Sequence, residues 1–124
     1  MTSPNGISWS RVTVGTTNWL YRVRWLNNTL LIVGQKGTIM TSTNGVNWSS
    51  RTSGTTAWLT DAAYVGDTWF AIGASGTVLS SSNLVSWVNR GTLTKKALYG
   101  AATDGGQLVI VGVEGVILRS QVIP

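Results

Sequence analysis

The sequence predicts an all-β fold in which one repeat unit occurs three times. A tryptophan recurs every 39 residues, at Trp9, Trp48 and Trp87. A Gly-x-x-Gly phrase keeps the same period, at residues 34–37, 73–76 and 112–115. The segments around these glycines are short and rich in Val, Ile, Thr and aromatic residues, which favour strands over helices. A constant period of a few tens of residues indicates a repeat architecture.

Each unit is expected to hold four short antiparallel strands. In the second unit we predict them at residues 59–65, 68–73, 77–81 and 86–90. Gly66-Asp67 is a pair that closes a hairpin, and the phrase from Gly73 to Gly76 tolerates positive φ at the next reversal. Four strands in about 40 residues is the arrangement of a β-propeller blade.

The phrase that ends at each recurring tryptophan predicts a tight turn between the third and fourth strands. Its Ser and Asn side chains can satisfy backbone groups locally, and the tryptophan can fold back over the hairpin and fix its register. The residues of this turn motif are Ser3, Asn5 and Trp9, then Ser42, Asn44, Gly45 and Trp48, then Ser81, Asn83 and Trp87. In the third copy Leu84 replaces the turn glycine, and we expect the hairpin to persist.

The phrase Ser-x-Asn-Gly-x-x-Trp resembles the Asp-box, or bacterial neuraminidase repeat, normally Ser-x-Asp-x-Gly-x-x-Trp. With the Gly-x-x-Gly-x-Ile/Val phrase it resembles the blades of sialidase-like propellers and of photosystem II assembly factor propellers. The resemblance covers nearly the whole chain and departs from the family in having Asn5, Asn44 and Asn83 where Asp is usual. It implies a β-propeller, and implies little about function, because in the family the motif is a structural turn away from the active centre.

We expect a single propeller-forming domain at residues 1–124, with repeats at about 13–51, 52–90 and 91–124. Three blades leave two open apolar sides. Residues 3–12 carry a turn phrase and a fourth strand with no blade before them, whereas the third repeat lacks its own. We therefore expect residues 3–12 of a partner chain to complete the third blade, so that a homodimer closes a six-bladed ring. A nine-bladed trimer and a fragment of a longer propeller are the alternatives.

The absence of Cys and His excludes disulfides, thiolate and imidazole metal sites, and histidine-based catalytic relays. The resemblance to sialidases raises a glycosidase, which needs paired carboxylates and, for sialic acid, an arginine cluster with a tyrosine nucleophile. The four acids do not supply such a pattern: Asp61, Asp67, Asp104 and Glu114. Arg22 has the place of Asp61 in the first unit, which favours a structural ion pair between blades. We therefore predict no enzyme activity, cofactor or metal.

The net charge of +5 comes from scattered basic residues, of which only Lys95 and Lys96 are adjacent. This pattern favours a solvated surface over a nucleic-acid site. No apolar run is long enough to cross a bilayer, and the N-terminus does not read as a signal peptide. We predict neither a nucleic-acid nor a membrane partner, and the sequence assigns no compartment.

Trp19 and Trp58 lie where the connection enters the first strand, at the rim on which propellers usually bind ligands. The loops that carry Gln35, Lys36 and Ser75 should share this rim. An aromatic ring beside amides, hydroxyls and a charge suits sugars. The sequence thus predicts a non-catalytic, lectin-like glycan-binding module, while packing of both tryptophans between blades is an equal alternative. The second functional hypothesis is a structural or protein-interaction propeller, including an engineered or reconstructed self-assembling repeat protein.

Overall fold

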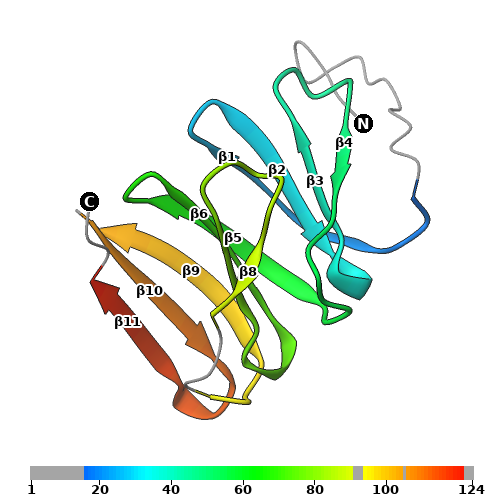
Figure 1. The fold of residues 1–124 in the computed structure, drawn as a ribbon. Helices are drawn as coiled ribbons and strands as arrows, with labels where there is room; N and C mark the ends of the chain where they lie inside the picture. Colours follow the sequence, from blue (N-terminus) through cyan, green and yellow to red (C-terminus); the bar gives the residue numbers. More distant parts are fainter. Residues whose placement is uncertain (1–15, 91–93, 105, 122–124) are drawn as a thin grey trace, which may run out of the picture.

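The computed structural model describes residues 16–90, 94–104 and 106–121, whose strands form three antiparallel sheets (Figure 1). The first sheet contains β1 (Leu20–Leu26), β2 (Thr29–Gly34), β3 (Ile39–Ser42) and β4 (Ser49–Arg51). The second contains β5 (Leu59–Val65), β6 (Thr68–Gly73), β7 (Val78–Ser81) and β8 (Val88–Asn89). The third contains β9 (Leu98–Asp104), β10 (Gln107–Gly112) and β11 (Ile117–Gln121). The prediction of an all-β fold is confirmed.

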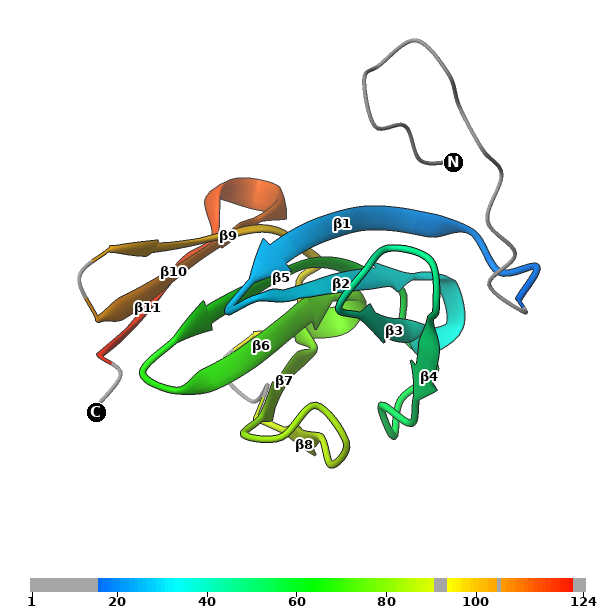
Figure 2. The ribbon, with the colours of Figure 1, turned by 90° about the horizontal axis from the view of Figure 1, so that it is seen from above.

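The three sheets lie face to face, with the second sheet between the other two (Figures 1 and 2). The first strands of the sheets are neighbours, and β5 contacts both β1 and β9. In the part of the chain that the structure describes, the sheets do not close into a ring. Among the described residues, the first and third sheets therefore each have one outer face without a neighbouring sheet.

The strands of the second sheet test the predicted boundaries directly. Strands β5 and β6 begin and end where the sequence predicts. Strand β7 begins one residue late, at Val78, and β8 covers only Val88–Asn89 instead of residues 86–90. The fourth strand is short because its ladder with β7 pairs only Leu79 with Asn89 and Ser80 with Val88.

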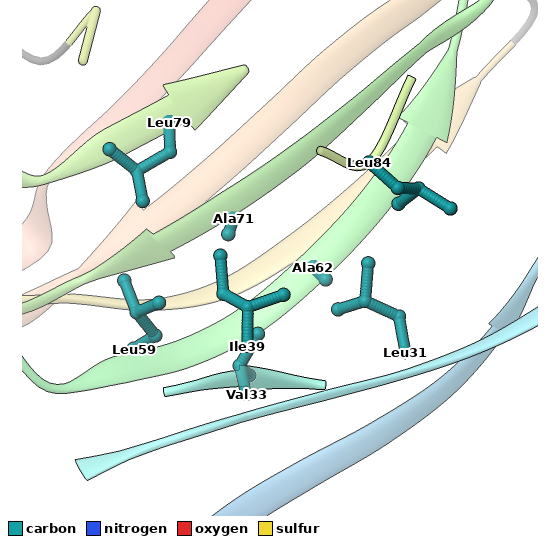
Figure 3. Packing of buried hydrophobic residues seen from close by; sticks show 8 residues of the cluster. All are labelled: Leu31, Val33, Ile39, Leu59, Ala62, Ala71, Leu79 and Leu84. Atoms are coloured by element: carbon teal, nitrogen blue, oxygen red, sulfur yellow. The ribbon is translucent and has the colours of Figure 1, made fainter. Parts of the chain in front are cut away.

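Two hydrophobic clusters hold the sheets together. The first lies between the first and second sheets, and Figure 3 shows its side chains pointing toward one another: Leu31, Val33, Ile39, Leu59, Ala62, Ala71, Leu79 and Leu84. The second lies between the second and third sheets: Ala63, Val65, Ile72, Leu98, Leu108 and Ile110. Each sheet interface is thus a layer of apolar side chains from two facing sheets.

The hairpin turns adopt the conformations that the sequence predicts. Gly66 and Asp67 have φ of 58° and 62°, as a two-residue type I′ turn requires. Asn27 and Asn28 close the equivalent hairpin of the first sheet with φ of 49° and 61°. Asparagine and aspartate tolerate this left-handed region better than other non-glycine residues.

The turn motif also forms as expected in the first and second sheets. The hydroxyl of Ser42 accepts hydrogen bonds from the backbone N–H of Asn44 and Gly45, at 3.2 and 2.8 Å. The Asn44 side-chain oxygen accepts two further backbone N–H groups, and the Trp48 indole donates to the Gly45 carbonyl at 3.2 Å. The copy with Ser81, Asn83 and Trp87 repeats every one of these bonds. Ser3, Asn5, Trp9 and the predicted strand at residues 3–12 lie outside the described residues.

A single 3-10 turn follows the second strand of each sheet: η1 (Gln35–Gly37), η2 (Ala74–Gly76) and η3 (Val113–Gly115). Among the described residues, no helix is long and apolar enough to span a membrane. The 3-10 turns are important because they hold the segment that leads into the first strand of each sheet.

Candidate functional site

An aromatic pair lies where the first and second sheets meet, at the end that carries the 3-10 turns. Trp58 immediately precedes β5, and Tyr21 lies on β1. Their ring centroids are 5.5 Å apart with an interplanar angle of 42°. The two residues are 45% and 43% exposed, respectively. The pair therefore holds two aromatic rings together while leaving much of both accessible.

The backbone around Trp58 is fixed by η2. The backbone N–H of Ala74 donates to the carbonyl oxygen of Trp58 at 2.8 Å. Gly73 permits this approach, because a Cβ atom there would lie 1.8 Å from the same oxygen. The conformation of Gly73 is extended, so its role is close approach and not positive φ.

Trp19 is held in the same way in the first sheet. Its carbonyl accepts a hydrogen bond from the Gln35 N–H at 2.8 Å, and its own N–H donates to Gln35 Oε1 at 3.3 Å. Trp19 is 66% exposed, which is more than Trp58. The structure thus brings together Trp19 and Gln35, two of the predicted ligand-binding residues.

The other predicted ligand-binding residues have different surroundings. Lys36 lines an open concavity of about 720 Å³ in which hydroxyls and backbone predominate, together with Arg51 and Thr52. Ser75 has the equivalent place in η2 and is exposed. Both residues have positive φ, 58° and 57°, and both are exposed. The five predicted residues therefore lie beside η1 and η2, at the same end of the first and second sheets, and do not line a single enclosed pocket.

Tyr21 lies at the same end of the first sheet, and its position in the repeat does not by itself indicate a binding residue. The sequence does hold one sign of such a role, because the first and third units have tyrosines, Tyr21 and Tyr99, at the position where the second unit has Thr60. A tyrosine on the first strand indicates a binding residue only once the neighbouring sheet is known to place Trp58 beside it. Side-chain contacts between sheets are long-range and are not encoded in local spacing.

Asp61 is a buried charged residue on β5 of the second sheet. It is 1% exposed and accepts hydrogen bonds at 2.8 Å from Nε and Nη2 of Arg24. The backbone N–H groups of Ala62 and Ala101 also donate to it, at 2.8 and 3.0 Å. The predicted ion pair between sheets is present, but its closest partner is Arg24, and Arg22 Nε lies 3.5 Å away.

These contacts determine the protonation of Asp61. Burial raises the pKa of its carboxyl group, but the hydrogen bonds from Arg24, Ala101 and Ala62 lower it by more, so the net pKa lies below its ordinary value. The carboxylate is therefore ionised at neutral pH and accepts hydrogen bonds from Arg24, Ala62 and Ala101. Such a group links the sheets and is poorly suited to transferring protons.

Asp67 and Glu114 make local contacts. Asp67 accepts a hydrogen bond from the Tyr64 hydroxyl at 3.3 Å, and Glu114 forms an ion pair with Lys96 on the surface. Within the described ranges, no group of three or more His, Cys, Asp or Glu side chains could hold a metal ion. Comparison of the chain with protein-family models, curated proteins and solved structures finds no match.

Proposed function

We propose that this chain is a non-catalytic module that binds glycans. The binding surface is the rim formed by the 3-10 turns and by the residues that precede the first strand of each sheet. The observation that carries the proposal is the half-exposed pair of Tyr21 and Trp58. The apolar face of a sugar ring stacks on such a surface while its hydroxyls take hydrogen bonds from polar neighbours.

Polar groups beside the pair support this choice of ligand. Arg22 Nε donates to the Thr60 carbonyl at 3.2 Å, which places a half-exposed guanidinium beside the strands that carry the pair. The Tyr21 hydroxyl and the Trp58 indole N–H are themselves hydrogen-bonding groups. A sugar needs both kinds of contact, whereas a purely apolar ligand would not use the polar ones.

The test is binding to a glycan array, followed by titration of any hit against variants. Trp58→Ala and Tyr21→Ala should each weaken binding at least about 10-fold, because each removes a stacking surface. Val85→Ala is a suitable control, since Val85 is 56% exposed but lies in the β7–β8 turn at the other end of its sheet. Unchanged binding by Trp58→Ala would contradict the rim site.

The assembly that we propose is a β-propeller in which two chains close a six-bladed ring. In the described residues, β11 is an edge strand, whereas the equivalent strands β3 and β7 pair with β4 and β8. Residues 10–12 have the repeat position of β4 and follow a copy of the turn phrase. Residues 3–12 of a partner chain would supply a fourth strand beside β11 and cover this edge. Light scattering should give twice the 13.2 kDa chain mass, and three times that mass would indicate a nine-bladed trimer instead.

A structural or protein-interaction propeller is the second candidate function. The observation that favours it is the set of exposed apolar residues on the outer sheet faces, among them Val23 and Ile117. Patches of this kind mark interaction surfaces. A stable oligomer with no glycan ligand would support this second function over the first.

A further inference from the structure

We propose that the outer face of the third sheet binds the outer face of the first sheet of a second copy, with Tyr99 packing against Trp19 of that copy. The interface would be head to tail, since two different faces of the chain meet. The inference rests on the proposed assembly of two chains and specifies its contact surfaces. It does not depend on whether the rim binds a glycan.

The outer face of the third sheet carries residues that the other two sheets bury. Val111 has the repeat position of Val33 and Ile72, and is 44% exposed where they are 1% and 0% exposed. Ile117 has the position of Ile39 and is 70% exposed, compared with 0%. In the first and second sheets these positions are covered by the next sheet. The third sheet therefore presents the same kind of surface, and none of the described residues forms a further sheet over it.

The outer face of the first sheet also exposes residues whose repeat equivalents are buried. Leu20 is 40% exposed, whereas its repeat equivalents Leu59 and Leu98 are both 0% exposed. Val23 is 55% exposed, whereas its equivalent Ala62 is 3% exposed. Leu59 and Ala62 pack against the sheet before them. The first sheet thus presents the surface that normally receives a preceding sheet.

The aromatic residues at the two outer faces are also more exposed than their repeat equivalents. Tyr21 of the first sheet meets Trp58, which leads into the second sheet. Tyr99 has the repeat position of Tyr21, and Trp19 has that of Trp58. Both are more exposed than their equivalents, at 53% and 66%. If the third sheet contacts the first sheet of another copy as the first contacts the second, Tyr99 meets Trp19 of that copy.

Charge does not oppose this contact. The positions equivalent to Arg24 and Asp61 at the new interface are Ala102 on the third sheet and Arg22 on the first sheet of the second copy. Arg22 is directed to its own chain, since its Nε donates to the Thr60 carbonyl and lies 3.5 Å from Asp61. Ala102 places no charge opposite it. The contact therefore brings no unpaired charge from these positions against another.

A second copy is the occupant that fits both faces at once. The two outer faces are related by the repeat, so each matches a surface that the chain already buries against itself. Two such contacts between two chains close a ring. If the rotation from one chain to the next did not close the ring, the same contact would give filaments. A face that bound its own copy symmetrically would place one third sheet against another, an arrangement that neither internal interface uses.

Cysteine cross-linking tests the contact directly, because the chain has no native cysteine. We would mix equal amounts of full-length Trp19→Cys and Tyr99→Cys chains, unfold and refold them together, and treat them with a short bis-maleimide. Cross-linked dimer is expected from the mixture. Each variant alone should give little cross-linked dimer, since residue 19 meets residue 99 and not another residue 19.

The outcomes separate this inference from the assembly itself. A dimeric mass with no cross-link between positions 19 and 99 would overturn the proposed contact and leave a dimer of another kind. Efficient cross-linking of Trp19→Cys alone would also overturn it, by indicating a symmetric contact. A monomeric mass for the wild-type chain would overturn both the assembly and the contact.

A pair of lysine variants provides a second test that does not depend on the distance between two cross-linked cysteines. Ile117→Lys should weaken association on the order of 100-fold, because it places a charge in the apolar centre of the contact. Val85→Lys is the matched control at a similarly exposed valine outside both faces, and should leave association unchanged. Circular dichroism would verify that both variants fold. Wild-type association by a folded Ile117→Lys variant would contradict the proposal.

Discussion

Arg24 and Asp61 form a two-point ion pair that joins the first sheet to the second, with both N–O distances at 2.8 Å. The carboxylate also receives the backbone N–H of Ala101 from the third sheet at 3.0 Å. One buried side chain therefore contacts all three sheets. Because these contacts lie on β1, β5 and β9, Asp61 fixes how the first strands are placed relative to one another.

Replacing Asp61 should destabilise the fold strongly. Asp61→Asn keeps the shape of the side chain but turns an amide N–H₂ toward donors, and it leaves Arg24 without its partner. We expect a loss of about 3 kcal/mol in the free energy of unfolding, measured by urea denaturation at fixed protein concentration. Asp67→Asn, in the exposed β5–β6 turn, should change it by less than about 0.5 kcal/mol. Equal stabilities of the two variants would contradict the central role of Asp61.

The same carboxylate predicts how stability depends on pH. The pKa of Asp61 is lower in the folded chain than its ordinary value of about 3.9. The folded state thus binds this proton less readily than the unfolded state, and the stabilisation is present above the unfolded pKa. It is lost as the pH falls below about 4 and through the folded pKa. Urea midpoints measured from pH 6 to pH 2 should fall less steeply for Asp61→Asn than for wild type. Parallel curves for the two proteins would refute this assignment.

Local signals predict the strands well, because their ends are marked by turn chemistry. Gly66-Asp67 closes one hairpin and the Gly73–Gly76 phrase marks the next reversal, so β5 and β6 match the predicted boundaries. Strand β8 is shorter than predicted because few of its residues pair with β7. Pairing depends on the neighbouring strand, and the composition of one segment does not report it.

Contacts between sheets were harder to predict. The repeat aligns Arg22 with Asp61, which suggested that these two residues pair. Arg22 Nε does lie 3.5 Å from Asp61 Oδ1, so this ion pair is present. The closer contact, at 2.8 Å, comes from Arg24, two positions further along β1, and the alignment of the repeats does not indicate it. The repeat likewise does not indicate Tyr21, because its partner Trp58 belongs to the next unit.

The backbone conformation of Leu84 leads us to expect that its glycine variant is more stable than its alanine variant. It has a φ of 68°, close to the 76° of its equivalent Gly45, and it is buried in the first hydrophobic cluster. Leu84→Ala and Leu84→Gly both lose this packing, at a cost of about 2–3 kcal/mol. Only glycine relieves the left-handed strain, so Leu84→Gly should be more stable than Leu84→Ala by about 1 kcal/mol.

Urea denaturation of the two Leu84 variants measures this difference. At Val85, which has no positive φ, the order should be the usual one, with the glycine variant less stable by about 0.5–1 kcal/mol. If alanine were the better replacement at both positions, strain at Leu84 would not be a measurable part of the turn.

Gly73 predicts a link between the 3-10 turn and the aromatic pair. A methyl group at this position would lie 1.8 Å from the Trp58 carbonyl oxygen, so Gly73→Ala must push Trp58 away from η2. We expect a loss of about 2–3 kcal/mol in unfolding free energy. Gly54→Ala is the control: its φ of 79° strains the alanine backbone, but no atom of the described residues lies within 4 Å of the added methyl group. That variant should lose only about 1 kcal/mol.

The nuclear magnetic resonance signal of the Trp58 indole N–H provides the structural measurement for these two glycine variants. It should shift in Gly73→Ala, because the ring of Tyr21 lies 5.5 Å from that of Trp58 and its shielding depends on their separation. It should stay in place in Gly54→Ala. Since the pair would move without either aromatic residue being replaced, Gly73→Ala should also weaken glycan binding. An unshifted Trp58 signal in Gly73→Ala would mean that the backbone contact with η2 does not position the pair.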